Sequence, residues 1–234
     1  MVPRGRQVSG FPARGPQPGG SANKPTTPDL RFAPPRDRYV YHPSTAEIPE
    51  GAAINFRNHS FKIAAEVNIS NGAQGVLFSH GGRFGCHSLF VKDNKLHYVY
   101  NWLGEIEQEI VSDIDVSAGD SVLGMAFERE SNDEQFSTLG TASLLVNDQK
   151  VGELSIKTQP GKFSLGGEGV NIGKDPGEQI CAAAYEPPFP CSGGSIREGI
   201  IDVSGEQNVD LELEALGIMK RDNPIGRRRL SPAP

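Results

Sequence analysis

Apolar and polar residues alternate with a period of two along most of the chain, starting near the segment RYVYHP at 38–43. In the segment 60–69, SFKIAAEVNI, every second residue is apolar. Side chains two residues apart on a β-strand share a face, so the alternation predicts a strand with one buried face. Shorter runs or alternations of this kind occupy residues 75–80, 120–130, 169–173 and 194–204. The pattern predicts an all-β domain.

Two segments of one design predict β-hairpins. Residues 87–102 and 141–156 each place an apolar strand, a polar turn and a second apolar strand in order. The turn dipeptides are Asp93-Asn94 and Asn147-Asp148, residue types that accept the positive φ of a tight hairpin turn. Between the hairpins, residues 104–113 alternate isoleucines with acids, which is typical of a half-solvated edge strand.

Short strands about every ten residues, with Gly, Asn and Asp between them, are the pattern of an antiparallel β-sandwich. The segment 209–219, VDLELEALGIM, fits either a short helix or a strand. We therefore expect one sandwich domain over residues 37–219.

The two ends of the chain differ from this domain. Residues 1–36 contain eight prolines and five glycines and show no apolar periodicity, so they cannot bury enough surface to offset the entropy of ordering. Residues 220–234, KRDNPIGRRRLSPAP, have the same character and are basic. The sequence predicts a disordered leader and a disordered basic tail.

Charge is unevenly distributed. Residues 1–38 carry a net +5 and residues 220–234 a net +4, so the total of −6 leaves −15 for residues 39–219. A domain this acidic repels a phosphate backbone, and we expect no nucleic-acid partner. The basic GRRRL at 226–230 is a solvated tail or a contact for an anionic surface.

No apolar run approaches the ~20 residues that span a bilayer, and the first 20 residues lack the apolar core of a secretory signal. These features predict a soluble chain with no membrane span and, by default, a cytoplasmic one. The three cysteines form no disulfide framework. Cys181 and Cys191 are close enough in sequence to pair under oxidising conditions, and three free thiols are the alternative.

Several motifs occur together in order: RDRYVYHPSTAEIPE, HGGRFG before FVKDNKLHYVYN, GKD, and PPFP before GSIREGIIDV. This ordered set, over roughly residues 29–204, resembles the C-terminal region of bacterial-type arylsulfatases. The resemblance implies a concanavalin A-like or laminin G-like β-sandwich (jelly roll) that follows an alkaline-phosphatase-like catalytic domain.

The catalytic motif of that family, Cys-x-Pro-x-Arg or Ser-x-Pro-x-Arg, does not occur in this sequence. The resemblance therefore implies a non-catalytic accessory domain that needs no cofactor. Its partner would be an arylsulfatase catalytic domain, in the same chain or as a split partner. If the domain is severed from that partner, the bared face favours self-association.

The glycine-rich turn at 80–85, HGGRFG, is the first candidate binding feature. It displays Arg83, whose planar guanidinium suits a carboxylate or a sulfate. Docking to a catalytic domain and an ion pair within the domain are equally open. His80 and His87 flank the turn as further docking candidates. A metal site that joins His87 and His97 across the hairpin is the alternative to half-buried structural histidines.

The aromatic residues Tyr98, Tyr100 and Trp102 share one face of their predicted strand. On a concave sheet face such a row can stack on sugars, and the alternative is packing in the core. The sugar-stacking hypothesis makes the chain a free-standing laminin G-like carbohydrate-binding module with a glycan partner. Asp93 and Asp175 are weak calcium candidates, with simple solvation as the alternative.

The segment CSGGSIR places Cys191 and Arg197 at the spacing of cysteine phosphatases. That chemistry requires a helix whose N-terminus cradles phosphate and lowers the thiol pKa. Here the residues that follow read as a strand, so we expect no phosphatase. No acid–base pair or activated nucleophile is recognisable, and we expect the chain to be no enzyme by itself.

Overall fold

The structure, a computed structural model, describes residues 37–50, 52–82, 84–134, 136–159, 169–177 and 180–204. The expected leader 1–36, the tail 220–234 and the segment 209–219 lie outside the described residues. No helix in the described part is long and apolar enough to cross a membrane. In these ranges the strands are Arg38–Tyr41 (β1), Phe61–Gly82 (β2), Gly85–Lys92 (β3), Lys95–Trp102 (β4), Ile106–Asp115 (β5), Gly119–Asn132 (β6), Thr138–Val146 (β7), Gln149–Thr158 (β8), Val170–Ile172 (β9) and Ser192–Asp202 (β10).

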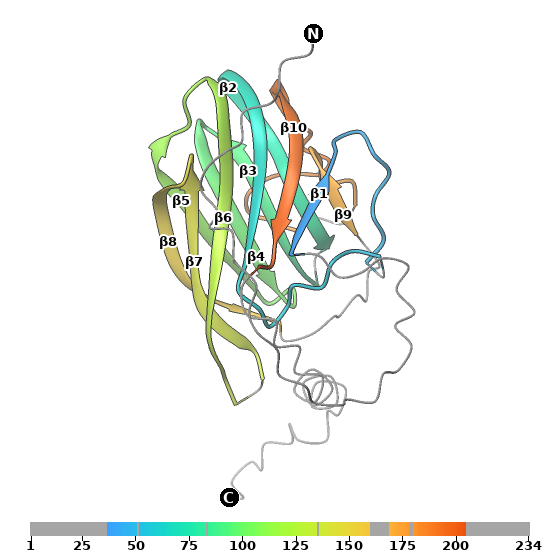
Figure 1. Cartoon of the computed structure of the whole chain (residues 1–234), viewed down its shortest axis with the longest axis vertical. Coiled ribbons are helices and arrows are strands. Elements are labelled where there is room, and N and C mark those ends of the chain that lie inside the picture. The colour runs from blue at the N-terminus through green and yellow to red at the C-terminus, as the bar shows by residue number, and fades with distance from the viewer. Residues whose placement is uncertain are drawn as a thin grey trace, which may run out of the picture. The chain divides into compact units, whose positions relative to one another are not determined.

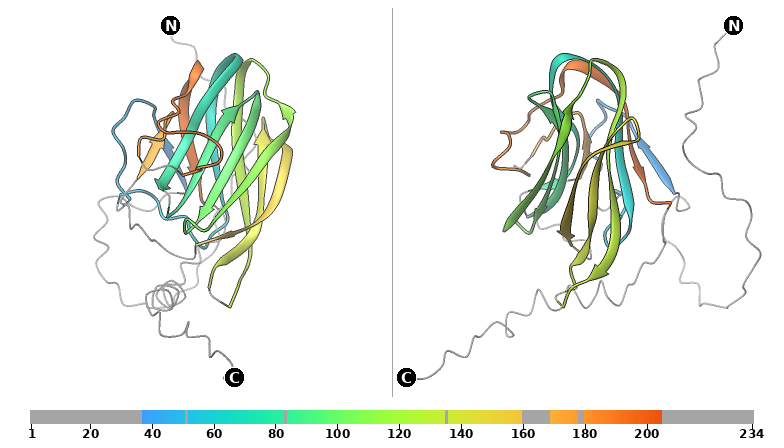
Figure 2. Two further views of the ribbon diagram at one scale, coloured as in Figure 1. Left: turned by 180° about the vertical axis from the view of Figure 1, so that it is seen from behind. Right: turned by 90° about the vertical axis from the view of Figure 1, so that its left-hand side faces the viewer.

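The strands form two antiparallel layers, which Figures 1 and 2 show face to face. The first sheet has the order β1-β10-β2-β6-β7-β8, and the second has the order β9-β2-β3-β4-β5. The expected antiparallel β-sandwich is confirmed. The edge-strand prediction is confirmed as well, because β5 closes one side of the second sheet.

Strand β2 belongs to both sheets. Its first half, Phe61–Ile69, pairs with β6 and β10, and its second half, Gly75–Gly82, pairs with β3. The right-hand view of Figure 2 shows the strand arching over one end of the sandwich. Gly75, at a φ of +121°, makes this crossover possible, because a Cβ there would lie 2.3 Å from the carbonyl O of Pro190.

The core lies between the two sheets and follows the predicted alternation. In the first half of β2, all five apolar residues of the alternation are buried. The largest fully buried side chains in this core come from both layers and from the segment before β2: Phe56, Ile63, Leu77, Phe78, Leu89, Leu96, Tyr98, Tyr100, Leu123, Met125 and Phe127. Burial of this apolar surface is the main force that joins the layers.

Both predicted hairpins are confirmed. Strands β3 and β4 are joined by Asp93-Asn94, with φ values of 50° and 60°. Strands β7 and β8 are joined by Asn147-Asp148, with φ values of 48° and 65°. Positive φ at both central residues gives a two-residue turn the twist of its flanking strands, which explains the choice of Asn and Asp.

Candidate functional site

The row of aromatic residues on β4 faces the core and offers no open surface for a sugar. Tyr98 and Tyr100 are 0% and 1% exposed, and Trp102 is 8% exposed. The Tyr98 hydroxyl bonds with His87 Nδ1 over 2.7 Å, and the Tyr100 hydroxyl accepts the Gln159 backbone N–H over 2.8 Å. Tyr98 and Tyr100 therefore pack in the core, and the hypothesis that a sugar stacks on all three rings is wrong. Only Trp102, at the end of the strand, approaches the edge of the sandwich.

His80 and His87 lie side by side in the interior, so neither can present its ring to a docking partner. Their ring centroids are 6.3 Å apart. Glu50 bonds with His80 Nε2 and with Arg57, whose Nη1 lies 2.9 Å from Glu50 Oε1. Burial lowers the pKa of His87 well below its usual range, and the positive charges of His80 and Arg57 add to that effect. These are structural histidines.

The two histidines of the proposed metal pair lie on opposite faces of the second sheet. His87 packs against Tyr100 in the core, with ring centroids 4.8 Å apart. His97 stacks on Phe90 at 4.8 Å and bonds with Glu109 over 2.9 Å. A metal site that joins His87 and His97 is therefore wrong. The described residues contain no group of three or more His, Cys, Asp or Glu placed to hold a metal ion.

The remaining single-residue candidates occupy unrelated places. Arg83 lies outside the described residues. Asp93 is exposed at the tip of the β3–β4 hairpin. Asp175 is 1% exposed and accepts a hydrogen bond from the Tyr185 hydroxyl over 2.8 Å. Burial raises the pKa of Asp175, so this carboxyl is not a solvated rim acid.

The outer face of the second sheet is covered by residues 180–190, which we call the strap. The strap places Ile180, Cys181 and Tyr185 in a second apolar cluster with side chains of β2, β3 and β4. Polar bonds fix it to β3 and β4: Ser88 Oγ with the Tyr185 hydroxyl at 2.7 Å, Asn101 Nδ2 to the Ile180 carbonyl O at 2.8 Å, and Lys92 Nζ to the Ala184 carbonyl O at 2.6 Å. The strap therefore closes much of this face to a ligand.

The phosphatase-like spacing has the wrong environment. Arg197 lies on β10, as the sequence predicts, and its Nη1 is 3.1 Å from Glu66 Oε2. Burial raises the pKa of the Cys191 thiol, where phosphatase chemistry requires a lowered one. Cys181 and Cys191 are both free thiols.

A different group of residues gathers around Lys157, where β4 and β8 end and β5 begins, near the β6–β7 turn. Lys157 Nζ lies 4.1 Å from the centroid of the Trp102 ring. The same ammonium is 3.1 Å from Asp133 Oδ2. Gln108 bonds with the backbone of Lys157. We call Trp102, Gln108, Asp133 and Lys157 the edge site.

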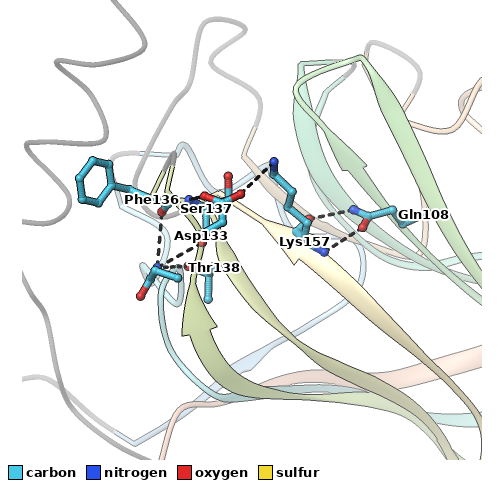
Figure 3. A network of polar contacts seen from close by, with 7 residues as sticks. Gln108, Asp133, Phe136, Ser137, Thr138 and Lys157 are labelled. Carbon is cyan, nitrogen blue, oxygen red and sulfur yellow. Dashed lines mark hydrogen bonds and ion pairs between the residues drawn. The ribbon is translucent and has the colours of Figure 1, made fainter.

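Each member of the edge site is held by backbone hydrogen bonds, as Figure 3 shows for three of them. Gln108 Nε2 donates to the Lys157 carbonyl O, and Gln108 Oε1 accepts the Lys157 backbone N–H, both at 2.8 Å. Asp133 Oδ1 accepts the Ser137 N–H over 2.8 Å. The backbone of Asp133 also bonds with Phe136 and Ser137, so the turn that carries the carboxylate is closed by its own bonds.

A second network supports the β6–β7 turn from behind. Asn58 Oδ1 accepts from Arg129 Nε at 3.0 Å, from Asn132 Nδ2 at 3.2 Å and from Thr138 Oγ1 at 3.2 Å. Arg129 Nη2 also donates to Asn132 Oδ1 at 2.6 Å. These bonds between β6, β7 and the segment before β2 fix the base of the turn, and thereby the position of Asp133.

The edge site is partly open and has one unused donor. The side chains of Lys157 and Asp133 are 28% and 24% exposed. The indole Nε1 of Trp102 is buried and has no hydrogen-bond partner among the described residues. A buried N–H without a partner is uncommon in proteins, so this donor sets Trp102 apart from the other buried aromatic residues of β4.

Sequence reasoning identified Trp102 but none of the other three members of the edge site. Gln108, Asp133 and Lys157 look like ordinary solvated residues of a strand or turn. The one usable signal was that Gln108 is the only amide side chain in its acidic, alternating segment, residues 104–113.

Comparisons with known proteins give structural similarity alone. No family model and no curated protein matches the chain. Domains LG4-5 of the mouse laminin alpha1 chain match 74% of this chain at 9% identity, with a TM-score of 0.41, and this chain covers 42% of that structure. Galectin LEC-6 of Caenorhabditis elegans matches 74% of this chain at 11% identity, with a TM-score of 0.40 and 99% of the galectin covered.

The binding domain of botulinum neurotoxin DC in complex with SialylT matches 70% of this chain at 15% identity. Its TM-score is 0.38, and 37% of it is covered. The matches thus include the laminin G type that the sequence analysis expected. Structural similarity at these sequence identities and TM-scores concerns the arrangement of the strands, and no ligand is inferred from it.

Proposed function

We propose that this chain is a non-catalytic carbohydrate-binding β-sandwich that holds its ligand at the edge site. The observation that carries the proposal is the position of the Lys157 ammonium against the indole ring of Trp102, with Asp133 paired to the same ammonium. There, an aromatic face and an ion pair that can donate and accept hydrogen bonds lie within contact distance at a partly exposed edge.

The chemistry of a sugar matches this combination. A pyranose has an apolar C–H face that suits an aromatic ring and a rim of hydroxyls that both donate and accept. Small-molecule sites typically combine aromatic lining with a few placed polar groups. The edge site supplies one aromatic ring, an ammonium, a carboxylate and an indole N–H.

Features elsewhere in the domain support a binding role over a catalytic one. Burial raises the pKa of both Cys181 and Cys191, which makes each thiol a poor nucleophile. His80 and His87 are buried, so neither reaches a substrate as a general base. The acidic body, with −15 over residues 39–219, also opposes a nucleic-acid ligand.

The test is a glycan array of the purified chain, followed by titration of each hit with intrinsic fluorescence as the readout. Trp102 is the chain's single tryptophan, so its emission reports the edge site directly. We expect a hit that changes this emission, and we expect Trp102→Phe to lose binding to that hit, measured by calorimetry because this variant has no tryptophan, while its far-ultraviolet circular dichroism stays unchanged. An array without hits, or a hit that Trp102→Phe binds normally, would refute the proposal.

The sequence resemblance supports a second function, that of an arylsulfatase accessory domain, and this stays a prediction. The motifs that carry it lie on several elements, among them β1, the β2–β3 turn and the strap. The test is a pull-down in which the purified chain is mixed with an arylsulfatase catalytic domain encoded directly upstream in the same genome. A complex on size exclusion would support it, and separate elution or the lack of such a reading frame would refute it.

A further inference from the structure

A row of apolar residues crosses the outer face of the first sheet. Val40, Ile200, Ala64, Gly124 and Leu145 lie directly opposite one another on the neighbouring strands β1, β10, β2, β6 and β7. Figure 1 shows these strands side by side. Neighbouring strands lie about 4.8 Å apart, so the row is about 19 Å long. We call these five residues the outer row.

The outer row points away from the core. Successive side chains on a strand point to opposite faces, and residues beside the row in sequence belong to the core, among them Ile63, Met125 and Leu144. Neither apolar cluster of the described residues contains a member of the row. The exposure of its larger members ranges from 8% at Ile200 to 43% at Val40. The row is therefore apolar surface outside the two clusters of the described domain.

The middle of the outer row is lower than its ends. A Cβ on Gly124 would lie 2.7 Å from the Ile63 carbonyl O and 3.2 Å from the Ala64 Cβ, so small residues form the floor there. Leu145 stands at one end of the row and Val40 at the other. A contiguous apolar surface typically marks a contact surface, and one of this shape fits the side chains of a single apolar segment.

We propose that residues 209–219, VDLELEALGIM, pack their apolar side chains on the outer row of their own chain. This inference is independent of the edge site. The segment lies outside the described residues, and its sequence supplies an apolar face in either of the two forms that it fits. In a strand Val209, Leu211 and Leu213 share a face, and in a helix Val209, Leu213 and Leu216 do.

The course of the chain brings this segment to the row. Strand β10 ends at Asp202, two residues beyond Ile200, and the Val203 N–H donates to the Asp37 carbonyl O over 2.7 Å. The chain therefore leaves the first sheet next to β1, about 7 Å from the outer row along the strand. Residues 205–208 can span about 13 Å, which suffices to place the segment on the row.

Two other occupants fit the row less well. Residues 1–36 also join the domain beside β1, but they are rich in proline and glycine and show no apolar periodicity. A second copy of the chain carries the same −15 over residues 39–219, so the two bodies repel each other. A segment tethered to the row by a short linker has a high effective concentration there, an advantage that no separate molecule shares.

The experiment uses the full chain with a photoreactive benzoylphenylalanine in place of Val40, and mass spectrometry identifies the peptides to which it attaches. The control carries the same group in place of Leu154, which is 39% exposed on β8 of the same sheet. Mixing isotopically heavy and light chains in equal parts distinguishes attachment within a chain from attachment between chains. A second pair of variants, Ala64→Glu and Ser155→Glu, adds the same charge in the row and at an exposed position on β8.

We expect the group at Val40 to attach to residues 209–219 of its own chain and the group at Leu154 not to do so. Ala64→Glu should speed amide hydrogen exchange in residues 209–219 by at least about tenfold, because a charge on the row opposes apolar packing, whereas Ser155→Glu should leave it unchanged. No attachment from Val40, attachment to other residues or between heavy and light chains, or equal exchange in the two variants would overturn the proposal. Exchange in β3 and β4 reports whether the fold is intact, and if Ala64→Glu unfolds, the crosslink alone decides.

Discussion

The side-chain amide of Gln108 makes both hydrogen bonds that a neighbouring strand would make with Lys157. Its Nε2 donates to the carbonyl O and its Oε1 accepts from the N–H, each over 2.8 Å. The two residues lie on β5 and β8, which are the edge strands of different sheets. An edge strand leaves backbone groups unpaired, and here one side chain pairs them across the two layers.

Replacing Gln108 by Leu should therefore destabilise the domain. The variant keeps a side chain of similar size but leaves the part-buried N–H and C=O of Lys157 without these partners. We expect a loss of about 1–3 kcal/mol in the free energy of unfolding, measured by urea titration. Gln149→Leu, at an exposed position on the same strand as Lys157, is the control and should change stability by less than about 0.5 kcal/mol. Equal effects in the two variants would contradict this role for Gln108.

The period-two pattern sufficed to predict which residues face the core and where the chain turns. Phe61 and Ile63 could be placed inward from alternation alone, and Asn147-Asp148 could be placed in a turn from its tolerance of positive φ. The same pattern cannot say which sheet a strand joins. Residues 60–69 and 75–80 read as two strands, whereas β2 is one element that crosses between the sheets at Gly75.

The candidate site was less accessible to sequence reasoning, because its members meet only in three dimensions. Tyr98, Tyr100 and Trp102 were correctly placed on one face, but alternation does not tell an open sheet face from one covered by a second layer. Asp133 and Lys157 come from distant segments, and a charged residue at the end of a strand is usually just solvated. The contact of Lys157 with Trp102, and that of Asp133 with Lys157, depend on how the two sheets pack.

The crossover at Gly75 gives a prediction with a matched pair of glycines. Both Gly75 and Gly72 have positive φ, at +121° and +77°. A Cβ at Gly75 would clash with the backbone of Pro190, whereas a Cβ at Gly72 would meet nothing within 4 Å. Gly72→Ala should cost about 1–2 kcal/mol from backbone strain alone, and Gly75→Ala should cost at least about 3 kcal/mol.

Urea unfolding of the two glycine variants, with near-ultraviolet circular dichroism as a check on packing, measures the difference. If Gly75→Ala is no less stable than Gly72→Ala, the close approach of β2 to Pro190 is not a constraint on the fold.

Asp175 gives a prediction with a defined dependence on pH. Burial raises the pKa of this carboxyl, so its ionised form weakens the folded state at pH values above the ordinary range of an aspartate. Asp175→Asn is uncharged at every pH and can still accept from the Tyr185 hydroxyl. We expect the variant to be more stable than wild type at pH 7, measured by urea titration.

That gain should shrink as the pH falls through the raised pKa of Asp175, because the wild-type carboxyl then becomes neutral too. Asp113→Asn, at an exposed position on β5, is the control and should give no such pH-dependent difference. A loss of stability at pH 7 in Asp175→Asn would indicate that the negative charge itself is needed, as in a cation site.

The buried histidine His87 leads to the opposite dependence on pH. Its pKa is well below that of an unfolded histidine, first through burial and then through the charges of His80 and Arg57. Between these two pKa values the unfolded chain binds a proton at this residue and the folded chain does not. Stability is therefore complete above about pH 6.5 and falls as the pH decreases, by up to about 1.4 kcal/mol per unit for one proton.

The contribution of His87 can be separated from that of other groups by comparing variants at each pH. His87→Phe keeps an aromatic ring among Phe56, Phe61 and Tyr100 and removes the titration, so its stability should fall less than that of wild type between pH 6.5 and 5.5. His42→Gln removes an exposed histidine and should follow the wild-type curve. Parallel curves for wild type and His87→Phe, from urea titrations at pH 7.5, 6.5 and 5.5, would mean that His87 takes up its proton equally well in the folded domain. The ring would then have to be open to water, which its packing among Phe56, Phe61 and Tyr100 and its bond with the Tyr98 hydroxyl do not permit.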